Sequence, residues 1–452
     1  MFNDEKLRRF GLDKVALLLL LLAGLFIAKL IVSSRGNFKS SQPIVLQGAG
    51  VTVSVPAGGG FEPLSDGFEY IDNEFRLSAA MKISSNSAVK VSWRYFIVPF
   101  KIAAAERFKE QASEIQGDIE TTGAEQFGQF TFDYAKIVSE KTELLLFSGT
   151  TQLPDGRTLS LEVAQKGQDI DLAEKIFRSL AASATFTPDN PLAEGKKLLD
   201  NFKNKTLAVL AKKKSEQNYS YVQNYTGRLI GFVTDAISVK PNKRNTDKRN
   251  TDSLIAANLY LLKVGVNSFA EQSLLRSDLN LKSFKWVSRQ SDLLINHDVI
   301  TSIELDKEGT VTIRNEKVEQ KFGFTPTMIP GILSDALIES FLRSDFNSVM
   351  VDMVLSDGRI TPAVIARAEL GKTPDPNAAF AVELTTFGKD ASKQTIYFDS
   401  NDNSLSSEVH GKISYKLENT DKEHLVASFP DWLEKIQQIG QYIFEKNEVK
   451  KD

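Results

Sequence analysis

The side chains that most often carry out catalysis are scarce in this chain of 452 residues. It has no cysteine, which excludes disulfides, thiolate metal sites and cysteine nucleophiles. Its three histidines, His297, His410 and His424, lie far apart and form no motif. No phosphate-binding loop, nucleophile elbow or zinc-binding helix motif occurs, and Gly58–Gly60 is followed by Phe61 rather than by a lysine. We therefore assign no catalytic, cofactor-binding or metal-ligating residue, and we expect neither a cofactor nor an enzymatic activity.

Two groups of oxygen-bearing side chains have a spacing that could suit a cation. Asp169 and Asp171 are placed like two ligands of a calcium loop, but the glycine and the glutamate of such a loop do not follow. Asp171 is better explained as a helix cap. The segment from Asp399 to Asn403 offers two aspartates and two asparagines in one turn. A weak calcium site is conceivable there, whereas a solvated turn is the default interpretation.

The overall composition is that of a globular protein with little net charge. Lysine plus arginine number 55 and aspartate plus glutamate 58, which gives a formal net charge of −3. This balance argues against a nucleic-acid partner bound by neutralising phosphates. Hydrophobic residues make up 42% of the chain and charged residues 25%, so the chain can form a packed core. Its length suggests two or three domains.

The most apolar segment is Val15–Val32, which carries one charge, Lys29, close to its end. An α-helix of this length spans roughly 27 Å, near the hydrocarbon thickness of a bilayer. Because no small-residue cleavage site follows, we expect a transmembrane anchor rather than a cleaved signal peptide. Four basic residues in 1–14 against two in 33–42 predict a cytoplasmic tail, a short outer tether, and the bulk of the chain outside the cytoplasm. In a Gram-negative bacterium that compartment is the periplasm, and the bilayer is the first expected partner.

Residues 43–187 have the pattern of a small α/β sandwich, an antiparallel sheet with helices packed on it. Val89–Ile97 alternates apolar and polar residues, as a half-buried strand does. One helix is predicted over Phe108–Ile119, and a second begins at Asp171. Three further strands are expected between the two helices.

The order of these elements resembles the PsbP-like fold. The resemblance lies in VTVSVPAG at Val51–Gly58, VSWRYFIVP at Val91–Pro99, and the turn LPDGR at Leu153–Arg157. It covers about a third of the chain. Because that family is mostly non-enzymatic, the resemblance implies binding or assembly rather than catalysis.

Residues 188–217 are predicted to form a basic helix that connects two domains. Asn190 can cap the helix and Pro191 suits its first position. The many lysines that follow suit a solvated connector, which is our main interpretation. Contact with anionic lipid is the alternative.

Residues 218–430 predict a larger antiparallel β domain wrapped on one amphipathic helix, Thr327–Arg343. GRLIGFV at Gly227–Val233 and QTIYFDSNDNSL at Gln394–Leu405 resemble LolA-like lipoprotein carriers, in which a half-barrel sheet wraps an apolar cavity. Here the helix either fills the sheet as core, the main interpretation, or leaves such a cavity. The perfect repeat KRNTDKRNTD at Lys243–Asp252 indicates an exposed loop. Residues 431–452 are predicted to form a last helix and a charged tail.

The expected fold is therefore α+β, with one transmembrane helix, a small α/β sandwich and a larger β domain. The expected function is that of a single-pass, membrane-anchored, non-catalytic envelope protein that acts in binding or assembly. We expect its second domain to hold a lipid or another apolar ligand, or to meet a protein partner. Two alternatives stay open, a structural or interaction subunit of a membrane complex, and a hydrolase with an unrecognised carboxylate site.

Overall fold

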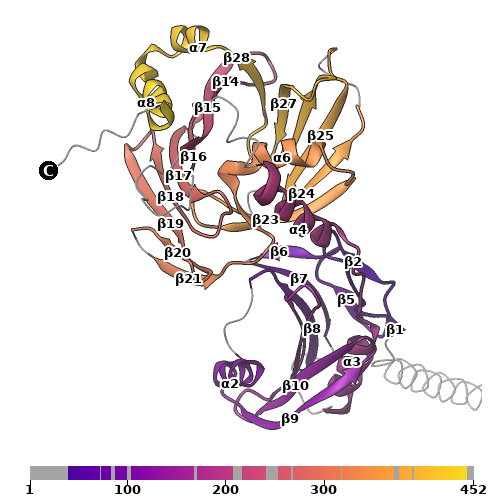
Figure 1. Ribbon diagram of the computed structural model, residues 1–452. Coiled ribbons are helices and arrows are strands. Elements are labelled where there is room, and N and C mark those ends of the chain that lie inside the picture. Colours follow the sequence, from indigo (N-terminus) through magenta and orange to yellow (C-terminus); the bar gives the residue numbers. More distant parts are fainter. Residues whose placement is uncertain are drawn as a thin grey trace, which may run out of the picture.

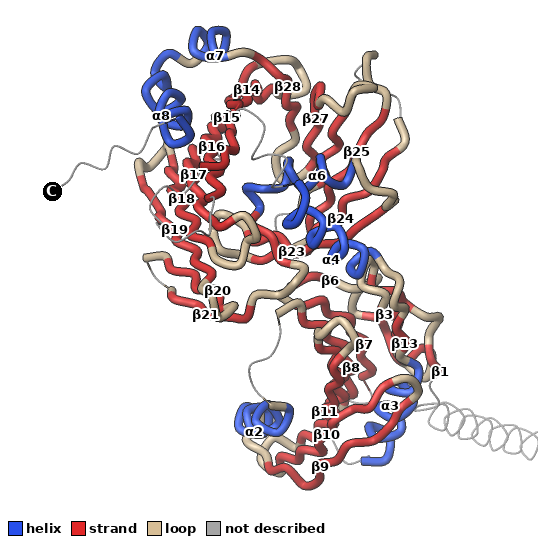
Figure 2. The backbone as a smooth tube through the Cα atoms, viewed as in Figure 1, coloured by secondary structure: helices blue, strands red, loops and turns tan. Residues whose placement is uncertain are grey.

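The computed structural model describes residues 39–444, except for ten short segments. These are residues 72, 83–86, 99–102, 167–169, 207–215, 241–252, 266–267, 317, 371–375 and 389–390. Strands dominate the described chain, which forms two bodies joined along one side (Figures 1 and 2).

The first body is built on an eight-stranded antiparallel sheet. Its order is β5-β7-β8-β12-β11-β10-β9, and β6 pairs with β7 beside β5. Its alternating strands bury one large side chain at every second position, as Trp93 and Tyr95 show, neither of which is exposed. The strands are β5 (Phe61–Pro63), β6 (Glu69–Ile71), β7 (Glu74–Lys82), β8 (Ala88–Phe96), β9 (Asp118–Phe127), β10 (Phe130–Ser139), β11 (Leu144–Gln152) and β12 (Thr158–Lys166).

Helices cover both faces of this sheet. Phe177 of α3 (Ile170–Ser183) contacts Phe127 and Phe147 on one face, and Phe108 of α2 (Ala104–Glu114) packs beside Ile137 on the other. Small strands complete the body, namely β1 (Lys39–Ser40) with β4 (Pro56–Ala57), and β2 (Ile44–Leu46) with β3 (Val51–Val53) and β13 (Thr185–Phe186).

The second body is one sheet of fifteen strands. The chain enters it in the middle, at β14, and runs outward strand by strand to β21. It then crosses to β22 at the opposite end and returns inward to β28, which pairs with β14. Because only residues 324–327 separate β21 from β22, the two ends of the sheet lie near each other without pairing, so the sheet is barrel-like.

The outward run consists of β14 (Glu216–Gln223), β15 (Leu229–Lys240), β16 (Ser253–Leu262), β17 (Phe269–Asp278), β18 (Phe284–Asp292), β19 (His297–Leu305), β20 (Thr310–Arg314) and β21 (Glu319–Gly323). The returning run consists of β22 (Met328–Pro330), β23 (Ser348–Val354), β24 (Ile360–Ala368), β25 (Phe380–Thr386), β26 (Lys393–Phe398), β27 (Ser404–His410) and β28 (Tyr415–Thr420). Every neighbouring pair is antiparallel except β22 and β23.

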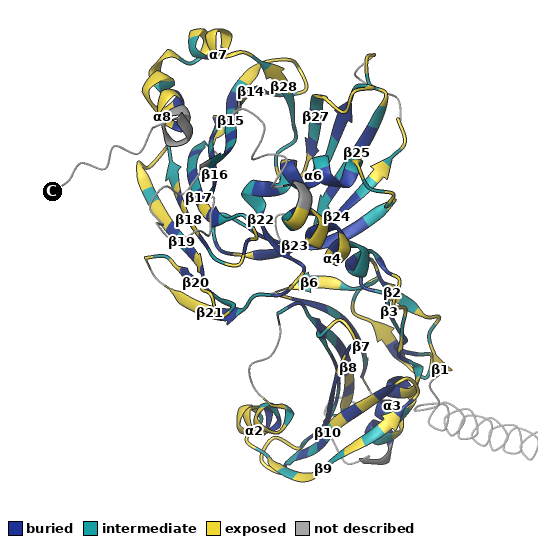
Figure 3. Cartoon of the chain, in the orientation of Figure 1, coloured by how far each residue is buried: buried dark blue, intermediate teal, exposed yellow. Residues whose placement is uncertain are grey.

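The concave face of this sheet packs on α6 (Ser334–Leu342) and on the 3₁₀ turn Gly331–Leu333 before it. Arg367 of β24 donates to the Ser344 carbonyl just after α6 at 2.7 Å, which ties the helix to the sheet. The convex face near β15 and β16 is covered by α7 (Lys422–Ser428), a 3₁₀ turn at Pro430–Trp432 and α8 (Leu433–Phe444), whose outer sides are exposed (Figure 3).

The two bodies share one hydrophobic core. α4 (Pro191–Asn201), continued by the π-helical turn Phe202–Thr206, lies between them against β23. Gly195 of α4 packs directly on the Met350 backbone, where a Cβ would collide with the carbonyl oxygen. The same cluster joins Trp93 of the first sheet to Phe341 of α6.

Several expectations from the sequence are wrong. The fold is β-dominated rather than α+β, because both bodies are organised by large sheets and the helices only cover their faces. The helix expected over Thr327–Arg343 is shorter, since Met328–Pro330 instead pairs with β23 as a strand. The helix expected over Phe108–Ile119 ends at Glu114, and a polar edge strand, β9, follows.

The transmembrane anchor also lacks support. No helix among the described residues is long and apolar enough to cross a membrane. Val15–Val32 itself lies outside the described residues, as does the repeat at Lys243–Asp252.

Candidate functional site

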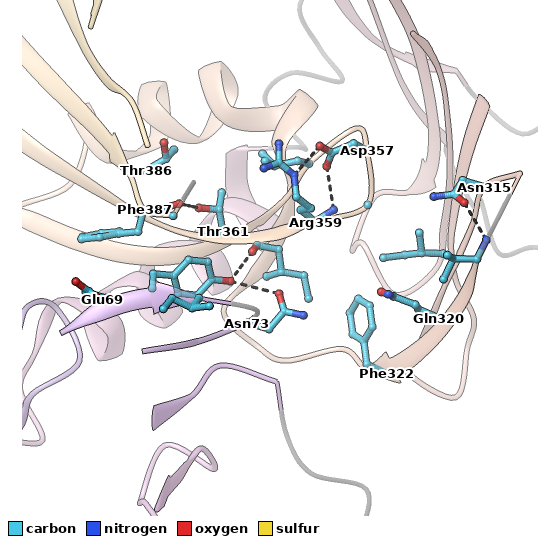
Figure 4. A pocket seen from close by; sticks show the side chains of 18 residues that line it. Glu69, Asn73, Asn315, Gln320, Phe322, Asp357, Arg359, Thr361, Thr386 and Phe387 are labelled. Carbon is cyan, nitrogen blue, oxygen red and sulfur yellow. Dashed lines mark hydrogen bonds and ion pairs between the residues drawn. The ribbon is translucent and has the colours of Figure 1, made fainter. Parts of the chain in front are cut away.

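A groove of about 950 Å³ lies at the junction of the two bodies. It is walled by β6 of the first body, by β20 and β21, and by the turn between β23 and β24 (Figure 4). Its apolar lining comes from Ile313, Phe322, Leu355, Ile360 and Phe387. A volume of this size is at the upper end of those of small-molecule sites.

Polar side chains line the rim of this junction groove, and some of them also hold it together. Tyr70 donates a hydrogen bond of 2.5 Å to the Ile360 carbonyl, which links β6 to β24. Arg359 is paired with Asp357 at 2.6 Å within the β23–β24 turn. The rim carboxylate of Glu69 has no ion-pair partner among the described residues, so the junction groove has a slight excess of negative charge.

A second candidate lies on the concave face of the large sheet. The strand register places six polar residues in one row across β14 to β19, namely Asn218, Asp235, Asn258, Ser273, Ser288 and Thr301. The row two residues away along the strands is apolar and includes Trp286 and Ile303, which belong to the core. Within the described residues, Asn258 Oδ1 and Ser288 Oγ have no hydrogen-bond partner.

Asp235 is the ionisable member of this row. Burial and the nearby Asp335 carboxylate of α6 raise the pKa of Asp235 to about 7, although a hydrogen bond from Asn218 opposes the change. Burial and Glu339 also raise the pKa of Asp335, even though its side chain is reached by solvent. Two carboxylates with raised pKa values on facing elements are typical of functional sites, although structural networks produce them too.

A buried ion pair joins the two bodies. Arg157, in the turn between β11 and β12, is paired with Asp352 of β23, and neither side chain is more than 3% exposed. Thr327 donates to the same carboxylate oxygen at 2.7 Å. Burial acts to lower the pKa of Arg157, but the Asp352 carboxylate raises it above its ordinary value, so the guanidinium stays charged.

The three histidines lie apart in the structure, in agreement with their wide spacing in the sequence. His297 starts β19 and bonds the Asp298 carbonyl at 2.9 Å, and His410 stacks on Tyr225. His424 contacts the Asp421 side chain, whose other oxygen caps α7.

The acidic clusters noted in the sequence form turns in the structure where they are described. The side-chain amide of Asn403 donates to Asp399 at 3.0 Å, and the backbone N–H groups of Asn403 and Asn401 donate to it at 2.9 Å and 2.7 Å, so these bonds lower the pKa of Asp399. Its carboxylate therefore stabilises the turn. Asp171 is the second residue of α3, which begins at Ile170, so the helix starts one residue earlier than expected, and Asp169 lies outside the described residues.

Sequence reasoning missed the junction groove and the Asp235–Asp335 pair altogether. Only the alternation of Asp235 with apolar neighbours in β15 could have placed it on the concave face, and nothing local points to Asp335 as its neighbour. The residues of LPDGR predict a turn, but nothing near Arg157 in the sequence predicts its partner, Asp352, in the second body.

Comparisons with known proteins add little. No protein-family model matches the sequence, and no similar protein was found among curated sequences. Among solved structures, the chain is similar to a β-barrel-like protein of the domain of unknown function DUF1849 from Brucella abortus. The identity is 9% and the TM-score 0.31, over 46% of this chain and 95% of that one. This likeness is compatible with a barrel-like sheet but carries no argument about function.

Proposed function

We propose that the protein is a non-catalytic binding or assembly protein, and that its ligand occupies the junction groove. The observation that carries the proposal is the groove itself, whose lining combines apolar and polar side chains from four separate segments of the chain. A lining of this kind is suited to binding a ligand and fixing its orientation. The finer resemblances, PsbP-like for the first body and LolA-like for the second, belong to this proposal and imply the same kind of role.

The proposal is tested with the dye anilinonaphthalene sulfonate, which binds apolar surfaces. Val318 lines the groove and is 46% exposed, whereas Val45 of β2 is 62% exposed and does not line it. We expect Val318→Glu to weaken dye binding at least tenfold, because a carboxylate would replace an apolar side chain in the lining of the groove. Val45→Glu, the matched control, should bind like the wild type. Equal binding by Val318→Glu and the wild type would overturn the proposal.

A hydrolase is the second candidate, and one observation favours it. Asp235, with a pKa of about 7, lies near a second carboxylate, an arrangement that can separate a general acid from a general base. A screen of chromogenic esters and glycosides between pH 5 and 8 would test it. Hydrolysis that is absent in Asp235→Asn would support the hydrolase, and no hydrolysis by the wild type would leave only the binding role.

A further inference from the structure

We infer that the junction groove takes an extended polypeptide, which adds as a strand to the outer edge of β21. This inference rests on the proposed function and names the class of ligand. β21 is the last strand of the fifteen-stranded sheet and pairs only with β20 among the described residues. The edge therefore presents peptide groups that the sheet itself does not use.

The hydrogen-bond pattern shows which peptide groups these are. The N–H of Asn315 bonds to the Val318 carbonyl at one end of the β20–β21 hairpin, and the N–H of Phe324 bonds to the Gly309 carbonyl at the other. In an antiparallel ladder, residue pairs that exchange hydrogen bonds alternate with pairs that do not. The bonds at the two ends of the hairpin agree on which residues of β21 belong to the bonded pairs. The N–H groups of residues 319, 321 and 323 consequently point away from β20, toward an incoming strand.

The side chains of β21 alternate in the same way. Val318, Gln320 and Phe322 face the groove, while Glu319 and Lys321 do not line it. An added strand would extend this alternation and place every second side chain in the groove, whose apolar lining includes Leu355.

The unused peptide groups favour a polypeptide over an acyl chain. A lipid tail in the groove would remove water from the edge of β21 and offer its N–H and C=O groups nothing in return. An extended peptide satisfies the same groups through main-chain hydrogen bonds.

The charges at the edge indicate a basic peptide. Arg314 is paired with Glu319 at 3.1 Å and with Glu304 at 3.9 Å, and Lys321 is paired with Glu319 at 3.1 Å. Two carboxylates therefore balance these two cations. Among the described residues that line the groove, Glu69 of β6 is the carboxylate without an ion-pair partner. A lysine or arginine of the incoming strand would compensate it.

The test uses the full chain and a fluorescein-labelled octapeptide of alternating valine and lysine. Lys321→Pro removes one outward N–H and leaves the bonds to β20 intact, while Lys321→Ala removes the same charge and keeps the N–H. We expect the peptide to bind the wild type and Lys321→Ala alike, and Lys321→Pro at least tenfold more weakly. The same peptide with N-methyl groups at alternate positions should not bind, and this second arm holds even if Lys321→Pro does not fold.

Three outcomes would overturn strand addition. They are no peptide binding, binding that Lys321→Pro leaves unchanged, and binding that survives N-methylation. Dye binding that is lost in Val318→Glu and displaced by oleate but not by the peptide would keep the proposed function and identify an apolar ligand instead. Self-association of the wild type that Lys321→Pro abolishes would mean that a second copy of the chain occupies the edge, which contradicts the basic peptide. If neither the dye nor the peptide binds, both proposals fail together.

Discussion

Asparagine in place of Asp235 should stabilise the protein at alkaline pH and leave its stability unchanged at acidic pH. In the folded protein this carboxyl has a pKa of about 7, compared with an ordinary value of 3.8. The folded state therefore binds a proton more tightly than the unfolded state does. A carboxyl with a raised pKa makes folding less favourable as the pH rises from the unfolded value to the folded one. The loss is complete above pH 7 and absent below pH 4.

The magnitude follows from the same two pKa values. A difference of about three pKa units corresponds to at most ~4 kcal/mol. Asp235 is partly exposed, so solvent screens its charge. We therefore expect a smaller destabilisation, of about 2 kcal/mol. Asparagine cannot ionise. At pH 8 the free energy of unfolding of Asp235→Asn should therefore be about 2 kcal/mol higher than that of the wild type, and at pH 4 the two values should be about equal.

Urea unfolding at pH 4, 6 and 8, followed by tryptophan fluorescence, measures this difference. Asp298→Asn is the matched control, because hydrogen bonds from Arg289 and Ser291 lower the pKa of that carboxyl. It should not stabilise the protein at pH 8. A stability difference for Asp235→Asn that is the same at all three pH values, or a loss of stability at pH 8, would refute the reasoning.

Three further substitutions test how the two bodies are joined. Asp352→Ala should lower the free energy of unfolding by about 3–5 kcal/mol because it strands the buried charge of Arg157, while the double variant Arg157→Met/Asp352→Leu should recover most of that loss in the same urea titration. If the double variant is as unstable as the single one, the stranded charge is not the cause. Gly195→Ala should cost about 1–3 kcal/mol, despite the higher helix propensity of alanine, because its Cβ meets the Met350 carbonyl, and an unchanged melting temperature would contradict this packing. Tyr70→Phe should cost about 1 kcal/mol through the lost bond to β24, and calorimetry showing no change would mean that water replaces it.

Local patterns predicted some elements of the fold well. Asn190 caps α4 as expected, accepting the Ala193 N–H at 2.9 Å, with proline at the first helical position. The alternation over Val89–Ile97 predicted β8, which spans Ala88–Phe96. These features depend on a few neighbouring residues, whose conformational preferences act without the rest of the chain.

Long-range features could not be predicted in this way. β9 has mostly exposed residues and no clear apolar alternation, so only its pairing with β10 makes it a strand. Asp235 and Asp335 become neighbours because the sheet curves around α6, and the junction groove exists because four separate segments meet. Such juxtapositions depend on the strand register and on the order of strands in the sheet, which no local preference encodes.

The buried pair between Arg157 and Asp352 also has a consequence during protein synthesis. The two residues are 195 positions apart, and at about 5–20 residues per second the ribosome needs roughly 10–40 s to add that length of chain. During that interval the β11–β12 turn presents an unpaired cation on a surface that is later buried. The nascent first body is therefore exposed to premature association with acidic chains, and a helper that shields this turn would improve the yield of folded protein.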